Sequence, residues 1–268
     1  MSEPVVSQPP RARRLRIVEL YPGAMFPQGD SGNVLALAWR ARRRGVEVDV
    51  GEARLGSAVP EADIYALGGG EDEDQPVIAA RLRDDGTVER RVRDGAVIFG
   101  SGAGFEILGH SFIDGDGRPA PGLGLVDARF TLGALVDRRV VTLENASLGL
   151  PAMSGYESHR GRADLGAGVE ALAGLEIGTG NGSTPPADGA VAAFGTGHVI
   201  GTWLHGPVLP RNPELADLVL AWALVPGLTP ADALARLVSR GPAESQFARL
   251  VRDERIAEAR RYATETSA

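Results

Sequence analysis

The chain has 268 residues, 43% of them hydrophobic and 24% charged, which is enough to bury the core of one large α/β domain or two small ones. Its formal net charge is −7 and its arginine clusters are short, which argues against a nucleic-acid-binding surface. It contains no cysteine, which excludes disulfides, thiolate metal sites and every reaction that needs a cysteine nucleophile. No run of about 18 apolar residues occurs, so the sequence predicts no membrane span. The composition fits a cytoplasmic protein.

The N-terminal part of the chain predicts a tail followed by alternating strands and helices. Residues 1–14 lack the apolar core of a secretory signal and predict a disordered, basic, Pro-rich tail. Short apolar runs then alternate with segments of helical periodicity, an order that builds a parallel sheet. Strands are expected at residues 16–20, 46–50, 63–67 and 96–100, and helices at 33–44, at 76–82 and from 105.

The pattern changes in the second half of the chain. Alternating residues such as 139–143 predict antiparallel strands, and residues 199–204 predict a late strand that ends at His205. Helices are expected at residues 213–223, 230–239 and 244–263. The sequence therefore predicts one α/β domain at residues 15–225 with a mixed sheet, followed by a helical C-terminal extension at residues 226–268.

Six strings in the sequence, taken together and in order, carry a family resemblance. The strings are Gly29–Asn33 (GDSGN), Gly68–Gln75 (GGGEDEDQ), Gly100–Gly109 (GSGAGFEILG), Gly155–His159 (GYESH), Gly201–Pro207 (GTWLHGP) and Leu209–Asp217 (LPRNPELAD). Over residues 15–222 they resemble class I glutamine amidotransferases of the cobyric-acid-synthase type, and most closely the glutaminase subunits of lipid II isoglutaminyl synthases.

The resemblance implies a fold and a chemistry. The fold is a three-layer, flavodoxin-like domain with a mixed, mainly parallel central sheet. In the family, a thiolate at a strand-to-helix turn attacks the glutamine amide, backbone N–H groups stabilise the oxyanion, and a histidine on a later strand moves the proton. Ammonia then passes to a Mur-ligase-like partner that uses ATP. ATP and Mg²⁺ are accordingly expected in the partner, with no cofactor and no metal in this chain.

The chain departs from the family at the nucleophile. The family turn reads Gly-x-Cys-x-Gly, and in this register the cysteine position is Gly102. A following glutamine of the family is replaced by Glu106, while His205 keeps the position of the catalytic histidine. These changes favour a degenerate, non-hydrolysing subunit that binds a Mur-ligase-like partner. Two alternatives stay open: an active hydrolase or amidotransferase with Ser101 as nucleophile, and a stand-alone small-molecule binding module.

Other residues are assigned by their place in the matching strings. Gly69, Gly70 and Ala103 are expected beside the pocket and its oxyanion hole, with a plain tight turn as the alternative for the glycines. Asp30 and Asn33 are expected at the N-terminus of the first helix, where Asp30 or Ser31 would be the cap. The alternative is a role at the subunit interface. Further candidates for contact with the substrate are Arg138 and Arg139, as a grip on the glutamine carboxylate, and Tyr156 and His159, which would shape the pocket.

Overall fold

The computed structural model describes residues 14–25, 29–239 and 245–266. The predicted tail at residues 1–14 lies outside these ranges except for Arg14, which begins the first strand. Within the described ranges, no helix has the length and apolar character needed to cross a bilayer.

The core of the molecule is a six-stranded sheet. Each neighbouring pair is parallel except β11 with β12, which is antiparallel. This confirms the prediction of a mixed, mainly parallel central sheet. In spatial order its strands are β11 (Ala190–Phe194), β12 (Gly197–Thr202), β4 (Val97–Ser101), β3 (Ile64–Leu67), β1 (Arg14–Leu20) and β2 (Glu47–Ala53).

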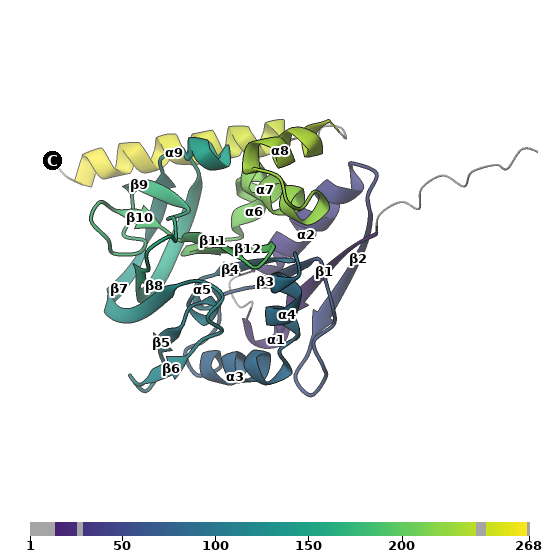
Figure 1. The fold of residues 1–268 in the computed structure, drawn as a ribbon. Coiled ribbons are helices and arrows are strands. Elements are labelled where there is room, and N and C mark those ends of the chain that lie inside the picture. The colour runs from purple at the N-terminus through teal and green to yellow at the C-terminus, as the bar shows by residue number, and fades with distance from the viewer. Residues whose placement is uncertain (1–13, 26–28, 240–244, 267–268) are drawn as a thin grey trace, which may run out of the picture.

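Helices cover both faces of this sheet, because successive side chains of each strand point to opposite sides (Figure 1). Leu15 and Ile17 of β1 pack with one set of helices, whereas Val18 and Leu20 pack with the other. The first set is α2 (Ser31–Arg42), α6 (Val208–Arg211), α7 (Pro213–Leu224) and α8 (Pro230–Val238). The second set is α3 (Gln75–Asp85), α4 (Thr87–Arg93) and α5 (Ala103–Leu108), with the short α1 (Pro22–Met25) beside them.

A second, largely antiparallel sheet lies beside the central one. Its longest strands, β7 (Ala128–Thr142) and β8 (Ser154–Leu165), pair antiparallel with a register shift between Leu132 and Val136. The C-terminal helix α9 (Gln246–Thr266) packs across β7, β8 and β9 (Figure 1). The other strands of this sheet are β5 (Ser111–Ile113), β6 (Pro119–Pro121), β9 (Ala173–Ile177), β10 (Ala187–Asp188) and β13 (Leu204–His205), and the turn η1 (Ala146–Leu148) connects β7 to β8.

The late strand ends differently from its prediction. β12 leaves the central sheet at Thr202, and β13 instead pairs with β8, so that His205 lies opposite Tyr156. The side chain of Asp188 accounts for the break, since it accepts hydrogen bonds from the Thr202 hydroxyl at 2.6 Å and from the Trp203 amide at 3.2 Å. The change of sheet turns His205 towards the end of β4.

Candidate functional site

The site is built on a tight turn between β4 and α5. Gly102 joins the two elements with φ +54° and ψ −121°, a conformation that glycine adopts far more readily than other residues. Its N–H donates to the Thr202 carbonyl at 2.9 Å, and its carbonyl accepts from the amides of Phe105 and Glu106. Hydrogen bonds therefore fix the turn on both sides, to β12 through the Gly102 N–H and to the first turn of α5 through the Gly102 carbonyl.

The imidazole of His205 occupies the space beside Gly102. A Cβ atom built on Gly102 would lie 2.3 Å from both Cε1 and Nε2 of His205. His205 is itself buried, with 4% of its surface exposed, so the ring is held in place by its surroundings. In this arrangement the turn has no room for a side chain, and the histidine faces a bare backbone.

Asp30 holds the other side of the histidine ring. Its Oδ2 accepts from the Gly69 amide at 2.9 Å and lies 3.3 Å from Nδ1 of His205. Asp30 stands at the N-cap position of α2, as expected, but its side chain makes no cap hydrogen bond. Its expected contact with a partner subunit is wrong, because the residue is fully buried. The Gly69 N–H donates to Asp30 and is therefore not free to stabilise an oxyanion.

Asn33 also lies inside the molecule rather than at an interface. It is 1% exposed, and its Oδ1 accepts from the Leu209 amide at 2.9 Å. The bond ties α2 to the start of α6, immediately after the segment that carries His205. The expected interface role of Asn33 is wrong for the same reason as that of Asp30: neither side chain reaches the surface.

Ser101 does not point into the site. It is the last residue of β4, it is fully buried, and its Oγ has no hydrogen-bond partner among the described residues. It is absent from the lining of the pocket beside Gly102. A serine nucleophile needs a base within hydrogen-bond reach, and the structure gives Ser101 none.

A pocket of about 290 Å³ opens next to the turn. It brings together most of the residues that the matching strings predicted, which come from segments far apart in the chain. Its lining includes Gly69, Gly70, Gly102, Ala103, Glu106, His159 and His205, together with Glu71, Asp72, Arg160, Trp203 and Leu132.

Glu106 is the ionisable group in the first turn of α5 at this pocket. Burial raises the pKa of its carboxyl group from 4.5 to about 7, and nearby Asp72 acts in the same direction. The amide of Gln75 opposes the shift by donating to Oε2 at 2.7 Å. Near neutral pH this carboxyl group is therefore about evenly divided between its protonated and ionised forms.

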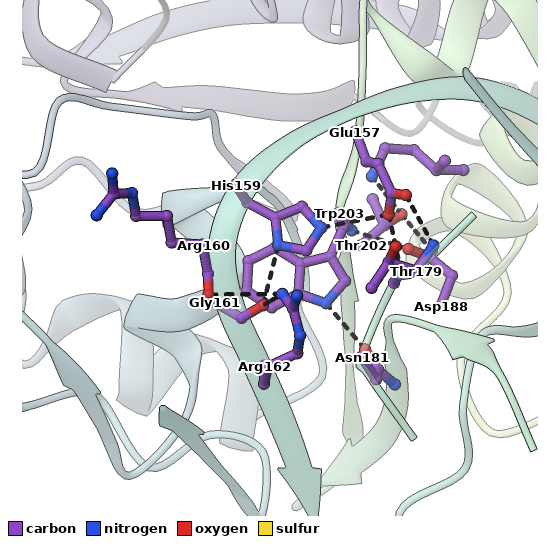
Figure 2. A network of polar contacts seen from close by, with 12 residues as sticks. Glu157, His159, Arg160, Gly161, Arg162, Thr179, Asn181, Asp188, Thr202 and Trp203 are labelled. Atoms are coloured by element: carbon purple, nitrogen blue, oxygen red, sulfur yellow. Dashed lines mark hydrogen bonds and ion pairs between the residues drawn. The ribbon is translucent and has the colours of Figure 1, made fainter. Parts of the chain in front are cut away.

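The pocket wall continues into a buried polar network (Figure 2). The ring of His159 stacks on Trp203, with 4.0 Å between centroids, and its two nitrogens face the Gly161 carbonyl and the Glu157 carboxylate. Glu157 also accepts from the amides of Thr179 and Gly180, and these bonds together with His159 lower the pKa of its carboxyl group, against the desolvation that raises it.

Asp188 lies in the same network. It is fully buried, and this burial raises the pKa of its carboxyl group to about 7 although Thr202 and Trp203 donate to it. Sequence reasoning assigned no role to Trp203 or Asp188. Trp203 stands in a matching string beside His205 and could have been singled out from it, whereas no sequence pattern marks Asp188.

Three predicted substrate contacts are not brought to the pocket. Arg138, Arg139 and Tyr156 line a separate depression between β7, β8 and α9, and Arg139 pairs with Glu258 at 3.2 Å. The expectation that they lie beside the site is wrong, because none of the three lines the pocket next to Gly102. Arg138 and Arg139 lie on the half of β7 beyond the register shift, which is next to α9.

The comparisons with known proteins agree with this geometry. A family model described as a CobB/CobQ-like glutamine amidotransferase domain matches residues 20–213. Two relatives are named as the GatD subunit of lipid II isoglutaminyl synthase (glutamine-hydrolyzing). The one from Streptococcus pneumoniae is 29% identical over 79% of this chain and 81% of its own length. The one from Staphylococcus aureus is 31% identical over 71% of this chain and 76% of its own.

Solved structures show the same fold. A crystal structure of a glutamine amidotransferase matches with a TM-score of 0.50 and 21% identity, covering 78% of this chain and 99% of the other. The structure of PurLQS from Thermotoga maritima matches with a TM-score of 0.50 and 15% identity, covering 85% and 98%. With the family model, the relatives and the fold in agreement, this chain belongs to the CobB/CobQ-like glutamine amidotransferase family.

Proposed function

We propose that this chain is a non-hydrolysing, amidotransferase-like subunit that binds a Mur-ligase-like enzyme, which forms amide bonds with ATP. One observation carries the loss of hydrolysis: the position at the strand-to-helix turn is Gly102, and the ring of His205 occupies the space that a nucleophilic side chain needs. The chain also has no cysteine elsewhere that could act in its place.

The retained geometry supports a role for the rest of the site. His205 still stands over the turn, Asp30 still supports it, and the pocket remains open at about 290 Å³. A frame that keeps its shape without its nucleophile fits a subunit whose contribution is binding rather than hydrolysis. ATP and Mg²⁺ belong to the partner in this proposal, because the partner activates the carboxylate.

The partner is inferred from the relatives. Their printed names describe subunits of a lipid II isoglutaminyl synthase, which is an assembly of more than one chain. We propose the same kind of assembly here, with the nitrogen supplied as ammonia or another amine rather than by hydrolysis of glutamine in this chain.

Reconstitution tests the proposal. The chain is co-expressed with a Mur-ligase-like protein from the same organism, and ATP-dependent amide formation is measured with ammonium chloride or glutamine as the only nitrogen source. We expect a stable complex that uses ammonium and not glutamine. Failure of the two proteins to associate would contradict the proposed partner. Efficient use of glutamine would contradict the proposal that this chain does not hydrolyse glutamine.

A stand-alone binding module is the second candidate, and the observation that favours it is the open pocket with the half-buried Glu106 in its wall. The same experiment separates the two, because a binding module stays monomeric in the presence of the ligase. An active enzyme with Ser101 as nucleophile receives no support from the position of that hydroxyl group.

A further inference from the structure

The carboxyl group of Glu106 lacks a partner on one side. Its Oε2 accepts from Gln75, but Oε1 receives no hydrogen bond from any residue that the structure describes. Oε1 lies close to the backbone of β8, since a Cβ atom on Gly161 would come within 2.3 Å of it. The absence of a side chain at Gly161 is what lets the carboxyl group lie against that strand at the pocket wall.

Two buried carboxylates of the molecule have several partners each. Glu157 accepts from two amides and faces His159, and Asp217 is paired with Arg40 and Arg44. Asp30 accepts from one amide and faces His205 through Oδ2, whereas its Oδ1 has no partner in the described part of the chain, and neither has Oε1 of Glu19. Neither Asp30 nor Glu19 lines this pocket, so of the three Glu106 is the carboxylate with an unpartnered oxygen at the pocket. Among the described residues, Glu106 has a neutral amide donor and no cation within ion-pair distance.

The groups that could neutralise Glu106 are engaged or distant. His159 and His205 each lie against another carboxylate, and Arg160, although it lines the pocket, makes no ion pair with Glu106 in the described structure. The acids Glu71 and Asp72 line the same pocket and make it still more favourable for a positive charge. A negatively charged ligand would meet repulsion from all three carboxylates.

We propose that this pocket binds a small organic ammonium ion, R–NH₃⁺, whose N–H group donates to Oε1 of Glu106. The ion supplies both the missing hydrogen bond and the missing positive charge, and charge-assisted hydrogen bonds are the stronger kind. Trp203 and Leu132, which also line the pocket, provide apolar surface for the alkyl part. The inference deepens the proposed function and rests on it, because an amine held here is a nitrogen donor that needs no glutamine hydrolysis.

Calorimetric titration of the full chain with n-butylammonium chloride at pH 8 tests the proposal, with sodium chloride at equal ionic strength as the blank. We expect saturable binding that Glu106→Gln weakens by about tenfold or more, equivalent to about 1.4 kcal/mol. Glu73→Gln is the matched control, because Glu73 is an exposed acid on the loop that carries Glu71 and Asp72 but does not line this pocket. It should leave the affinity within about twofold of the parent, well under 1 kcal/mol.

Tetramethylammonium separates hydrogen bonding from charge alone, since it carries the charge without an N–H group. We expect no detectable binding of it. The proposal fails if n-butylammonium does not saturate, if Glu106→Gln binds it as tightly as the parent, or if tetramethylammonium binds equally well. These outcomes are independent of the test of the proposed function, because the titration contains neither glutamine nor a ligase.

Discussion

At the scale of single residues, the contact between Gly102 and His205 decides what the site can do. An alanine at position 102 would have to adopt a positive φ, and its methyl group would have to displace the imidazole ring. The strain of the positive φ depends on the backbone of residue 102 alone, whereas the clash with the ring depends on both residue 102 and His205. A double-mutant cycle separates them.

We expect Gly102→Ala to lower the free energy of unfolding by about 2–4 kcal/mol in the parent, of which backbone strain supplies about 1–3 kcal/mol. In the His205→Ala background the ring is gone, so the same substitution should cost at least about 1 kcal/mol less. Urea unfolding of the four proteins measures the coupling. An equal cost in both backgrounds would show that the ring does not fill this space.

Glu106 should give the stability of the protein a characteristic dependence on pH. Burial raises its pKa to about 7, so the folded state keeps a proton that the unfolded chain has already released above pH 4.5. The folded state therefore loses stability as the pH rises from 4.5 to 7, by about 3 kcal/mol in total.

Glu106→Gln removes this loss. The stability of the variant relative to the parent should increase between pH 5 and pH 8, since Asp188 titrates in both proteins and cancels in the difference. Urea unfolding at the two pH values measures it. A difference that does not change with pH would mean that Glu106 ionises in the folded protein as it does in the unfolded chain.

At the scale of elements, the position of α5 depends on close contact with β3. A Cβ atom on Gly104 would lie 2.3 Å from the Leu67 carbonyl oxygen and 2.7 Å from that of Gly68. These are backbone atoms of a central strand and of the loop that follows it, so they cannot move aside as a side chain can. The close approach holds the turn at Gly102 against the glycine loop.

We expect Gly104→Ala to lower the free energy of unfolding by about 2 kcal/mol or more, because the helix must move away from the strand. Gly23→Ala is the matched control: Gly23 also lies in a short helix, and nothing comes within 4 Å of its Cβ position. Its effect should stay within about 1 kcal/mol. Equal effects of the two substitutions in thermal unfolding would contradict the contact.

The elements also show which parts of the fold the sequence could predict. The buried strand β3 is apolar throughout and β4 is apolar up to its final serine, and the predicted ends of both lie within one residue of those observed. The long strand β7 was recognised only at residues 139–143, because its middle is exposed and its register shifts between Leu132 and Val136. Polarity alternates cleanly only where pairing is regular, so such a strand leaves a weak pattern.

The site was predictable where its residues share a string and not where they meet across the fold. Gly102, Ala103 and Glu106 lie within one short string of the chain, and the structure places all three at the pocket. The contact between Asp30 and His205 joins residues 175 positions apart, and no periodicity reports such a distance. The arrangement of the sheets, which sets that contact, follows from the break at Thr202 that sequence patterns did not show.

At the scale of the whole molecule, one buried ion-pair cluster joins the first helix layer to the C-terminal part. Asp217 of α7 accepts from Arg40 at 2.6 Å and from Arg44 at 2.9 Å, and Arg40 also donates to Ser245, just before α9. Removing the carboxylate leaves two buried guanidinium groups without their counter-ion, which costs far more than losing an exposed pair.

We expect Asp217→Ala to lower the free energy of unfolding by about 3–5 kcal/mol. Asp116→Ala is the control, since Asp116 pairs with Arg118 at the surface and exposed pairs contribute less than about 1 kcal/mol. Urea unfolding of both variants checks the comparison. A loss for Asp217→Ala as small as that of the control would show that this buried cluster stabilises the fold no more than an exposed ion pair does.

The most direct test of the account is glutamate release from glutamine by the purified chain, alone and with the proposed Mur-ligase-like partner. We predict no release above the buffer blank in either state, because Gly102 offers no nucleophile and His205 fills its place. Release that disappears in Ser101→Ala or His205→Ala, with both variants still folded, would contradict the central claim and identify a hydrolase at this site.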